Sequence, residues 1–454
     1  MTVMLLSLIL GALIAFYFYL TRNYKFWQKR GVPCLDGALP GFGHTLPVIS
    51  MKTHFSDFCC KIYNDYKGRS MVGIYDFTSP SLMILEPELV KTVLQTNYSN
   101  FSENTLEIDP KVDPLVSHSP YILNGEKWLA NRKRLTYAFS SMRLKLLFEN
   151  VKNVCASYEN YINEKLRNKQ TEFELKTLFA RYTAQVVAAA GFGVDGYCFD
   201  DEKKEISFRR LGKAVFEPSK RHKIVMAFTF FIPSLNKIFK VSFVPKHVDH
   251  FFRKLVADLM EQRRKDGIPR NDFLYFMTEL ERAEGTKFDT EYLTGQAMSF
   301  VLESYETSSS IMSYAGFYLA KNPEIQEKLR EEVISVLNKY DGELTYENLR
   351  EMTYIPVQAL HKDPQYWKNP EEFDPERFDR KNHIEKFTFL PFGEGPRICV
   401  GMRMAQLQIK AGLAIVMKKY RLKLSPKTQL PLKMIPGTFL PTPVGGLWVT
   451  IQQL

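Results

Sequence analysis

Apolar residues recur at helical spacing through most of the chain. This spacing predicts helices over residues 125–147, 158–166, 178–190, 248–264, 292–319 and 402–420. A further helix is expected from Asn322 to about Tyr340, because a capping residue, a proline and an acid stand in order at its start. Runs typical of strands are short and lie at 70–75, 82–85 and 446–452. The pattern predicts a mainly α fold with a small β region.

The N-terminus has a different pattern, with no charged side chain in residues 1–20 and an almost wholly apolar run over 3–20. A helix of this length spans about 30 Å, the thickness of the hydrocarbon core of a bilayer. A cleaved signal peptide is the alternative, but no basic residue precedes the run and no small-residue cleavage signal follows it. We therefore predict a single transmembrane helix that anchors the chain over residues 1–21. Basic residues follow directly, which predicts that the rest of the chain faces the cytoplasm.

Residues 22–47 are basic and rich in proline and glycine, with Pro33, Pro40 and Pro47 among them. Helix does not continue through such a segment, so a stiff linker is expected. Over residues 48–454 we find no further proline-rich or Gly/Ser-rich linker. The sequence thus predicts three parts: an anchor at 1–21, a linker at 22–47, and a single domain at 48–454 that is large enough to be an enzyme.

The 454 residues carry 61 Lys and Arg against 50 Asp and Glu, a net charge of +11. The basic residues are scattered and no nucleic-acid-binding motif accompanies them, so we expect no nucleic-acid partner. An excess of positive charge that is spread over the chain is more typical of a protein that contacts an anionic membrane surface or an acidic protein partner. Six cysteines without regular spacing argue against a disulfide framework or a zinc site.

A loop before the last long helix places one cysteine where a thiolate would be stabilised. Its sequence is FGEGPRICVG, from Phe392 to Gly401. Backbone N–H groups and the positive end of a helix dipole favour a charged sulfur at Cys399. If Cys399 binds heme iron, Gly395 permits the turn and Gly401 allows a flat porphyrin to approach closely. Arg397 would then reach a propionate, and Phe392 would shield the sulfur from water. A free buried cysteine is the alternative.

The pattern Phe-x-x-Gly-x-Arg-x-Cys-x-Gly resembles the heme-binding loop of the cytochrome P450 monooxygenases. Trp128 and Arg132 resemble the pair on a family helix that contacts the heme propionates. Glu306 and Thr307 match the acid–alcohol pair that delivers protons to oxygen bound on the iron. Residues 375–378, PERF, match a further family segment. Together with the anchor, the chain is similar to insect microsomal members of the family-six type.

This resemblance implies the triangular, mainly helical cytochrome P450 fold with a small β region, behind one transmembrane helix. It implies heme (iron protoporphyrin IX) with Cys399 as the axial metal ligand and with Trp128, Arg132, Arg397, Phe392 and Gly401 around it. Glu306 and Thr307 would be the catalytic residues. The expected reaction inserts one atom of O₂ into lipophilic small molecules, such as xenobiotics, insecticides or steroid-like hormones. Electrons would come from NADPH-cytochrome P450 reductase at the endoplasmic reticulum membrane, with a docking face around Lys127, Arg132, Lys133 and Arg134.

One departure from the family lies in the oxygen-binding helix, where Glu303 and Ser304 replace two small residues. Glu303 shares a helix face with Glu306 and Thr307. A carboxyl group near the distal face of the iron would tend to be protonated by desolvation, or would bind iron or water in place of O₂. The alternative is that Glu303 turns away from the heme and pairs with a basic neighbour.

A second departure is an apparent internal deletion, which leaves the fold incomplete. The family carries a Glu-x-x-Arg helix after the stretch at 344–354, but here residues 351–354 run directly into 355–361. The matches Glu327–Arg330 and Glu347–Arg350 both precede this junction and are interpreted as coincidental. Without the helix, Arg377 is expected to lose its partner in a water-poor region, which typically costs about 3–5 kcal/mol.

Three alternatives to an active enzyme remain. In the first, the chain is a catalytically impaired or inactive shortened product, from a splice form, a gene-model error or a decaying copy. A second alternative is a heme-thiolate protein that binds heme without activating O₂, which Glu303 favours. A soluble α-helical protein with a fortuitous cysteine loop is disfavoured by the three further matches.

Overall fold

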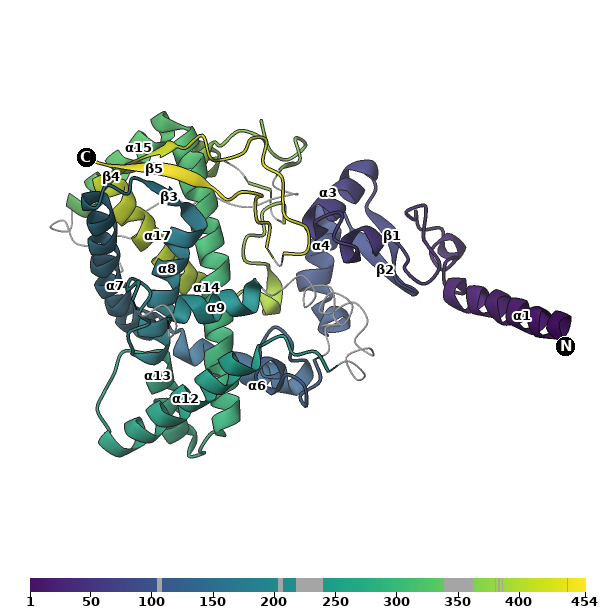
Figure 1. The fold of residues 1–454 in the computed structure, drawn as a ribbon, viewed down its shortest axis with the longest axis horizontal. Helices are drawn as coiled ribbons and strands as arrows, with labels where there is room; N and C mark the ends of the chain where they lie inside the picture. The colour runs from purple at the N-terminus through teal and green to yellow at the C-terminus, as the bar shows by residue number, and fades with distance from the viewer. Residues whose placement is uncertain are drawn as a thin grey trace.

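The computed structural model describes residues 1–103, 108–202, 207–217, 240–338, 362–379, 381–382, 384–385, 387–438 and 440–454. In this part of the chain, long helices pack around α14 (Thr290–Lys321), which runs through the middle of the molecule (Figure 1). Most of α14 is buried because neighbouring helices cover it on several sides. The predicted mainly α fold with a small β region is confirmed.

The other long helices have these bounds: α6 (Gly125–Ala138), α7 (Ser141–Arg167), α8 (Leu175–Val187), α9 (Phe208–Phe216), α12 (Lys246–Asp266), α13 (Phe273–Glu284), α15 (Pro323–Asn338) and α17 (Met402–Lys419). The helices predicted at 248–264, 292–319 and 402–420 are confirmed as α12, α14 and α17. The single helix predicted at 125–147 is wrong. Ser140 is extended, with φ −61° and ψ 156°, so α6 ends at Ala138 and α7 begins at Ser141.

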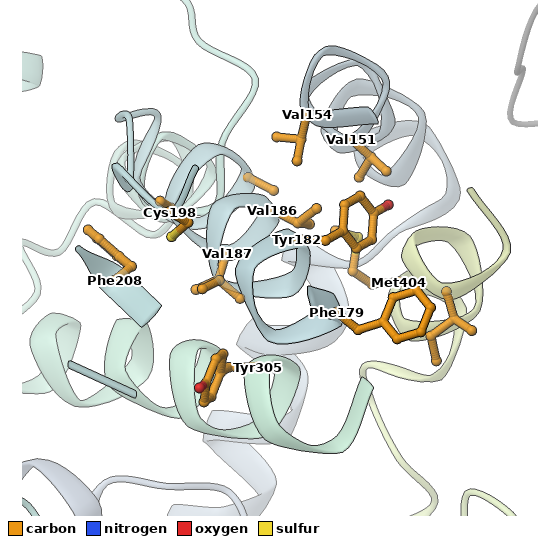
Figure 2. Close-up of a cluster of buried hydrophobic side chains, with 14 of the residues drawn as sticks. Val151, Val154, Phe179, Tyr182, Val186, Val187, Cys198, Phe208, Tyr305 and Met404 are labelled. Carbon is orange, nitrogen blue, oxygen red and sulfur yellow. The ribbon is translucent and has the colours of Figure 1, made fainter. Parts of the chain in front are cut away.

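The main core lies where α7, α8, α14 and α17 meet (Figure 2). Close approach of these helices depends on Gly412, where an added Cβ would lie 2.5 Å from Met312 and 2.7 Å from the Tyr182 ring. The Tyr182 hydroxyl is buried and donates a hydrogen bond to the Gln408 carbonyl at 2.8 Å. A glycine on α17 and a tyrosine on α8 thereby set the spacing of the helices behind the site.

Two small sheets flank the helices. The hairpin β1 (Met71–Asp76) and β2 (Ser79–Ile84) is antiparallel, with Met71 opposite Ile84. The second sheet has the order β3 (Glu172–Glu174), β5 (Trp448–Gln453) and β4 (Tyr420–Leu424), all antiparallel. β3 directly precedes α8, so this sheet positions the start of that helix.

The N-terminal helix α1 (Thr2–Thr21) projects away from the rest of the chain in Figure 1. Its mean hydropathy reaches 2.4 over the most apolar window and none of that window is buried, so α1 is long and apolar enough to cross a membrane. The segment after α1 packs on the first hairpin. Tyr24 donates to the Phe77 carbonyl at 2.9 Å, and Trp27 Nε1 donates to the Ile74 carbonyl at 3.1 Å.

Candidate active site

A cavity of about 1690 Å³ opens between the loop before α17 and residues of α6 and α14. The residues that the sequence predicts for the site all line this one cavity: Trp128, Arg132, Glu306, Thr307, Phe392, Arg397, Cys399 and Gly401. They come from three regions far apart in the sequence. The fold therefore brings together the set that the motifs single out.

The cysteine loop has the backbone that its glycines predict. Gly395 has φ +73°, and an added Cβ would overlap the carbonyl oxygen of Leu94. The Cys399 amide donates to the Phe392 carbonyl at 2.9 Å, which closes the loop. These constraints hold the sulfur at the end of a tight turn, directly before α17.

The Cys399 side chain is exposed, and its exposed surface faces the cavity. Desolvation raises the pKa of its thiol above the usual value, and hydrogen bonds from the amides of Gly401 and Met402 and the charge of Arg132 offset only part of this shift. The carboxyl group of Glu303, which lines the same cavity, also raises this pKa. A bound cation would act in the same direction as the amides and Arg132.

Two arginines give the cavity a cationic side. Arg397 donates to the Ser102 carbonyl at 3.0 Å and to Asn124 Oδ1 at 2.9 Å, and its guanidinium carbon lies 4.6 Å from the centre of the Trp128 ring. Arg132 is half-buried on α6, and desolvation lowers its pKa although the Cys399 thiolate would raise it. Both guanidinium groups therefore stand where an anionic group in the cavity would pair with them.

These residues fit heme. Cys399 offers a sulfur with two amide donors beside it, and Arg132 and Arg397 offer cations for carboxylate groups. An added Cβ at Gly401 would stand 3.9 Å from the Cys399 sulfur, an ordinary contact distance, so Gly401 lies directly beside the sulfur. The donor set matches a thiolate-bound macrocycle with acidic substituents.

The acid and the alcohol on α14 differ in their partners. Glu306 is buried and forms an ion pair with Lys176 of α8, with 3.0 Å between Lys176 Nζ and Glu306 Oε1. The Thr307 hydroxyl donates to the backbone carbonyl of Glu303 one turn earlier. Both residues line the cavity. Motif spacing finds Glu306 and Thr307, but it gives no signal for Lys176.

Glu303 faces the cavity and does not turn away from it. Its Oε1 accepts a hydrogen bond from the Ser119 hydroxyl at 3.2 Å. Desolvation raises its pKa from 4.5 to about 7, and the Ser119 bond lowers it only in part. In the described part of the chain no ion pair joins Glu303 to a basic residue, so the alternative in which Glu303 turns away and pairs with a basic neighbour is wrong there.

The expected loss of a partner at Arg377 is also wrong. Arg377 is half-exposed and donates to three backbone carbonyls, those of Asn369 at 3.1 Å, Glu372 at 2.9 Å and Asp374 at 3.0 Å. The guanidinium therefore remains satisfied locally, because its own loop supplies the acceptors.

The match Glu327–Arg330 has a structural role away from the cavity. Arg330 is 4% exposed and donates to the carbonyls of Met417 and Tyr420, at the junction of α17 and β4. Glu327 pairs with Arg330 at 3.2 Å and with Arg421 at 3.5 Å. The second match, Glu347–Arg350, and the junction at 354–355 lie outside the described residues.

Comparison with known proteins identifies the family. A family model described as cytochrome P450 matches residues 33–357 and 355–448. The chain is 31% identical to cytochrome P450 6a2 of Drosophila melanogaster, over 99% of both chains. It is 30% identical to cytochrome P450 9e2 of Blattella germanica over 95% of each, and 28% identical to cytochrome P450 6A1 of Musca domestica over 98% of this chain and 97% of that one.

The same comparisons bear on the apparent deletion. The two parts of the family match meet at 355–357, where the sequence places the junction. The alignment to cytochrome P450 6a2 extends over 507 positions, more than the 454 residues of the chain. Relatives of full length therefore carry residues that this chain lacks.

Proposed function

Because the chain belongs to the cytochrome P450 family, a family of heme-thiolate monooxygenases, we propose that it inserts one oxygen atom from O₂ into lipophilic small molecules, with electrons from NADPH-cytochrome P450 reductase. The observation that carries this proposal is that the exposed sulfur of Cys399 shares one cavity with Trp128, Arg132, Glu306 and Thr307. Xenobiotics, insecticides and steroid-like hormones are the expected substrate classes.

Each side of the cavity has a proposed task. Cys399 would hold the heme iron through its sulfur, with Gly401 and Phe392 beside it. Arg132, Arg397 and Trp128 would hold the propionates. When bound, the heme supplies the activation of oxygen, which electron donation from the thiolate favours. Because Arg397 is fixed by backbone acceptors and by the Trp128 ring, it meets a propionate without first ordering its own side chain.

Proton delivery is assigned to Glu306 and Thr307. Glu306 is buried beside the Lys176 ammonium, and this ion pair holds its carboxyl group in one orientation. The Thr307 hydroxyl donates to a helix carbonyl and keeps its oxygen lone pairs available as acceptors toward the cavity.

The walls of the cavity favour apolar substrates. Aromatic side chains line it from several elements: Phe101, Phe139, Phe216, Phe243 and Phe300. Contact with such walls removes apolar surface of a ligand from water at about 25 cal/mol per Å². This supports lipophilic molecules as the substrate class.

We propose that α1 anchors the chain in the endoplasmic reticulum membrane with the catalytic domain in the cytoplasm. The reductase would dock on the exposed Lys127 and Lys133 of α6. The other two basic residues considered for this face have other positions. Arg132 lines the cavity, and Arg134 pairs with Glu284 at 2.8 Å.

The carbon-monoxide difference spectrum of the reduced, purified chain tests this function. A strongly red-shifted Soret band is expected from the wild type and is lost in Cys399→Ala, because the thiolate ligand is removed. Cys60→Ala is the matched control, since Cys60 is half-buried and lies outside the cavity lining. A wild-type spectrum without that band would contradict the proposal.

A second candidate function is heme binding without oxygen activation. Glu303 favours it, because its carboxyl group faces the cavity and has a raised pKa. The apparent deletion at the junction 354–355, where the two parts of the family match meet, favours a further alternative, an impaired shortened product. Under the second candidate function the wild type shows the red-shifted band but consumes no NADPH with reductase, and Glu303→Ala restores consumption.

A further inference from the structure

Lys176 is the second residue of α8, and its side chain reaches into the protein toward α14. Its ammonium lies 3.0 Å from Glu306 Oε1 and donates to the Glu306 backbone carbonyl at 3.1 Å. It also donates to the hydroxyls of Ser309 at 2.7 Å and Ser310 at 2.8 Å. An ammonium has three N–H donors, so these acceptors engage all of them.

The backbone around Lys176 is held in place from the preceding strand. The Glu174 carboxylate caps α8 by accepting from the amide of Lys176 at 3.0 Å and from that of Thr177 at 2.6 Å. Glu174 is the last residue of β3, which pairs with β5. The ammonium is therefore delivered to Glu306 by a fixed helix terminus.

A second, small cavity lies behind this ion pair. It has a volume of about 30 Å³, and Glu174, Lys176 and Ser310 contribute to its lining. This volume is large enough for a water molecule, which needs roughly 10–15 Å³ and polar partners such as these residues. Ser310, Tyr314 and Pro441 line both this cavity and the large one, so these residues form part of the wall between the two.

We propose that Lys176 is a positioning residue for Glu306, and that water in the small cavity behind it is the entrance for the proton that Glu306 delivers. The proposal rests on the function proposed above. One proton enters from bulk water through the small cavity, and the Lys176 ammonium gives a proton to Glu306 Oε1. The amine then recovers a proton from that water. The charge on Lys176 is the same before and after, and no oxidant or reductant is needed.

The electrostatics of the cluster support this route. Desolvation lowers the pKa of Lys176, while Glu306, Glu174 and Glu217 raise it. A lysine whose pKa is lowered by burial gives up a proton more readily than one in water. The Tyr305 ring also lies near the Lys176 ammonium, with its centre 5.9 Å away.

The test compares Lys176→Met with Lys176→Arg in the membrane-bound holoenzyme with reductase. The readouts are product per NADPH consumed, peroxide released and the solvent deuterium isotope effect, with ethoxycoumarin as the probe substrate. Proton transfer by a positioned group contributes about 10²–10⁴-fold, so losing its positioning is expected to lower product per NADPH about tenfold in Lys176→Met. Peroxide release and the isotope effect should rise. Lys176→Arg should also give a low yield, because an arginine keeps the positive charge beside Glu306 but does not release a proton.

Lys165→Met is the matched control, because Lys165 also forms an ion pair, with Asp201 at 2.7 Å, but on another face of the core. Its yield and isotope effect should match those of the wild type. In a Glu306→Gln background, Lys176→Met should have no further effect, since Lys176 acts through Glu306.

The outcomes separate the two proposals. A wild type that consumes no NADPH overturns the proposed function and this inference with it. An active wild type with an unchanged isotope effect in Lys176→Met overturns this inference alone. Full yield in Lys176→Arg would show that a positive charge beside Glu306 is enough, and would overturn the transfer of a proton through Lys176. A Lys176→Met protein that has lost its Soret band would show that the residue holds the fold instead.

Discussion

The guanidinium of Arg397 lies over the ring of Trp128, 4.6 Å from its centre, although the two residues are far apart in the sequence. Arg397 belongs to the cysteine loop and Trp128 to the first turns of α6. The contact ties the loop that presents the sulfur to the helix that carries Arg132. The position of Arg397, one of the proposed propionate contacts, therefore depends on the Trp128 ring.

Trp128→Leu is expected to weaken heme retention. The change removes a cation–π contact worth about 0.5–2 kcal/mol and frees Arg397 to move. The measurement is the ratio of Soret to protein absorbance after gel filtration, together with the melting temperature. Trp448→Leu is the control, since Lys427 lies 5.0 Å from that ring, away from the cavity. Equal heme content in the two variants would contradict the prediction.

The sequence predicts the site better than it predicts the surroundings of the site. The eight predicted site residues, among them Trp128 and Gly401, all line one cavity. Each belongs to a family motif, so the sequence alone is enough to find them. The hydrophobic periodicity does not predict the break at Ser140, because the apolar residues keep their helical spacing on both sides of it. Lys176 and Ser119 carry no motif. Their roles depend on which elements pack together, and the spacing within one helix does not contain that information.

The partners of Arg377 are a second example of contacts that the sequence pattern does not predict. The expectation of a buried, unpaired arginine rests on the missing family helix, but the local loop supplies three carbonyl acceptors. Backbone carbonyls are present at every residue, so no sequence pattern marks them as partners. The expectation fails because it considers side-chain partners alone.

Arg330→Met is expected to destabilise the fold by about 2–4 kcal/mol, because it leaves buried carbonyls of α17 and β4 without their donor. Urea unfolding followed by circular dichroism measures this change. Arg421→Met is the control. It shares the partner Glu327 but is exposed, so about 0–1 kcal/mol is expected. Equal losses in the two variants would show that burial of Arg330 does not matter.

Asp201 gives a pH dependence of stability. Partial burial opposes its charge, but hydrogen bonds from Lys165 and Arg181 prevail and lower its pKa from 3.8 to about 2. A lowered folded-state pKa adds stability above pH 3.8 that is lost as the pH falls toward 2. Since the carboxylate is about a third exposed, screening reduces the effect to about 1 kcal/mol.

Asp201→Asn should therefore be less stable than the wild type at neutral pH, with the difference shrinking below pH 3.8. Urea unfolding at a series of pH values measures it. Glu261→Gln is the control, because Glu261 pairs with Lys265 on the surface. A constant difference between Asp201→Asn and the wild type at every pH would contradict the ionic origin.

The pKa of Glu303 shifts in the opposite direction to that of Asp201, so its effect on the pH dependence of stability is also opposite. Desolvation raises its pKa from 4.5 to about 7, so the folded state binds a proton more tightly than the unfolded state. The wild type should then lose stability as the pH rises from 4.5 to about 7. Glu303→Gln removes this loss and should be the more stable protein above pH 7, by about 1–2 kcal/mol after allowing for water in the cavity.

Unfolding of Glu303→Gln and the wild type at acidic and alkaline pH checks this, with Glu303→Ala beside them. Alanine removes the carboxyl group and also the acceptor of the Ser119 hydroxyl, whereas glutamine keeps an oxygen there. Both variants should lose the wild-type dependence between pH 4.5 and 7, because both lack the titrating group. If the wild type and Glu303→Gln keep a constant difference across that range, the carboxyl group is solvated and ionised as in water. In that case desolvation does not protonate it, and its effect on oxygen binding would come from its charge.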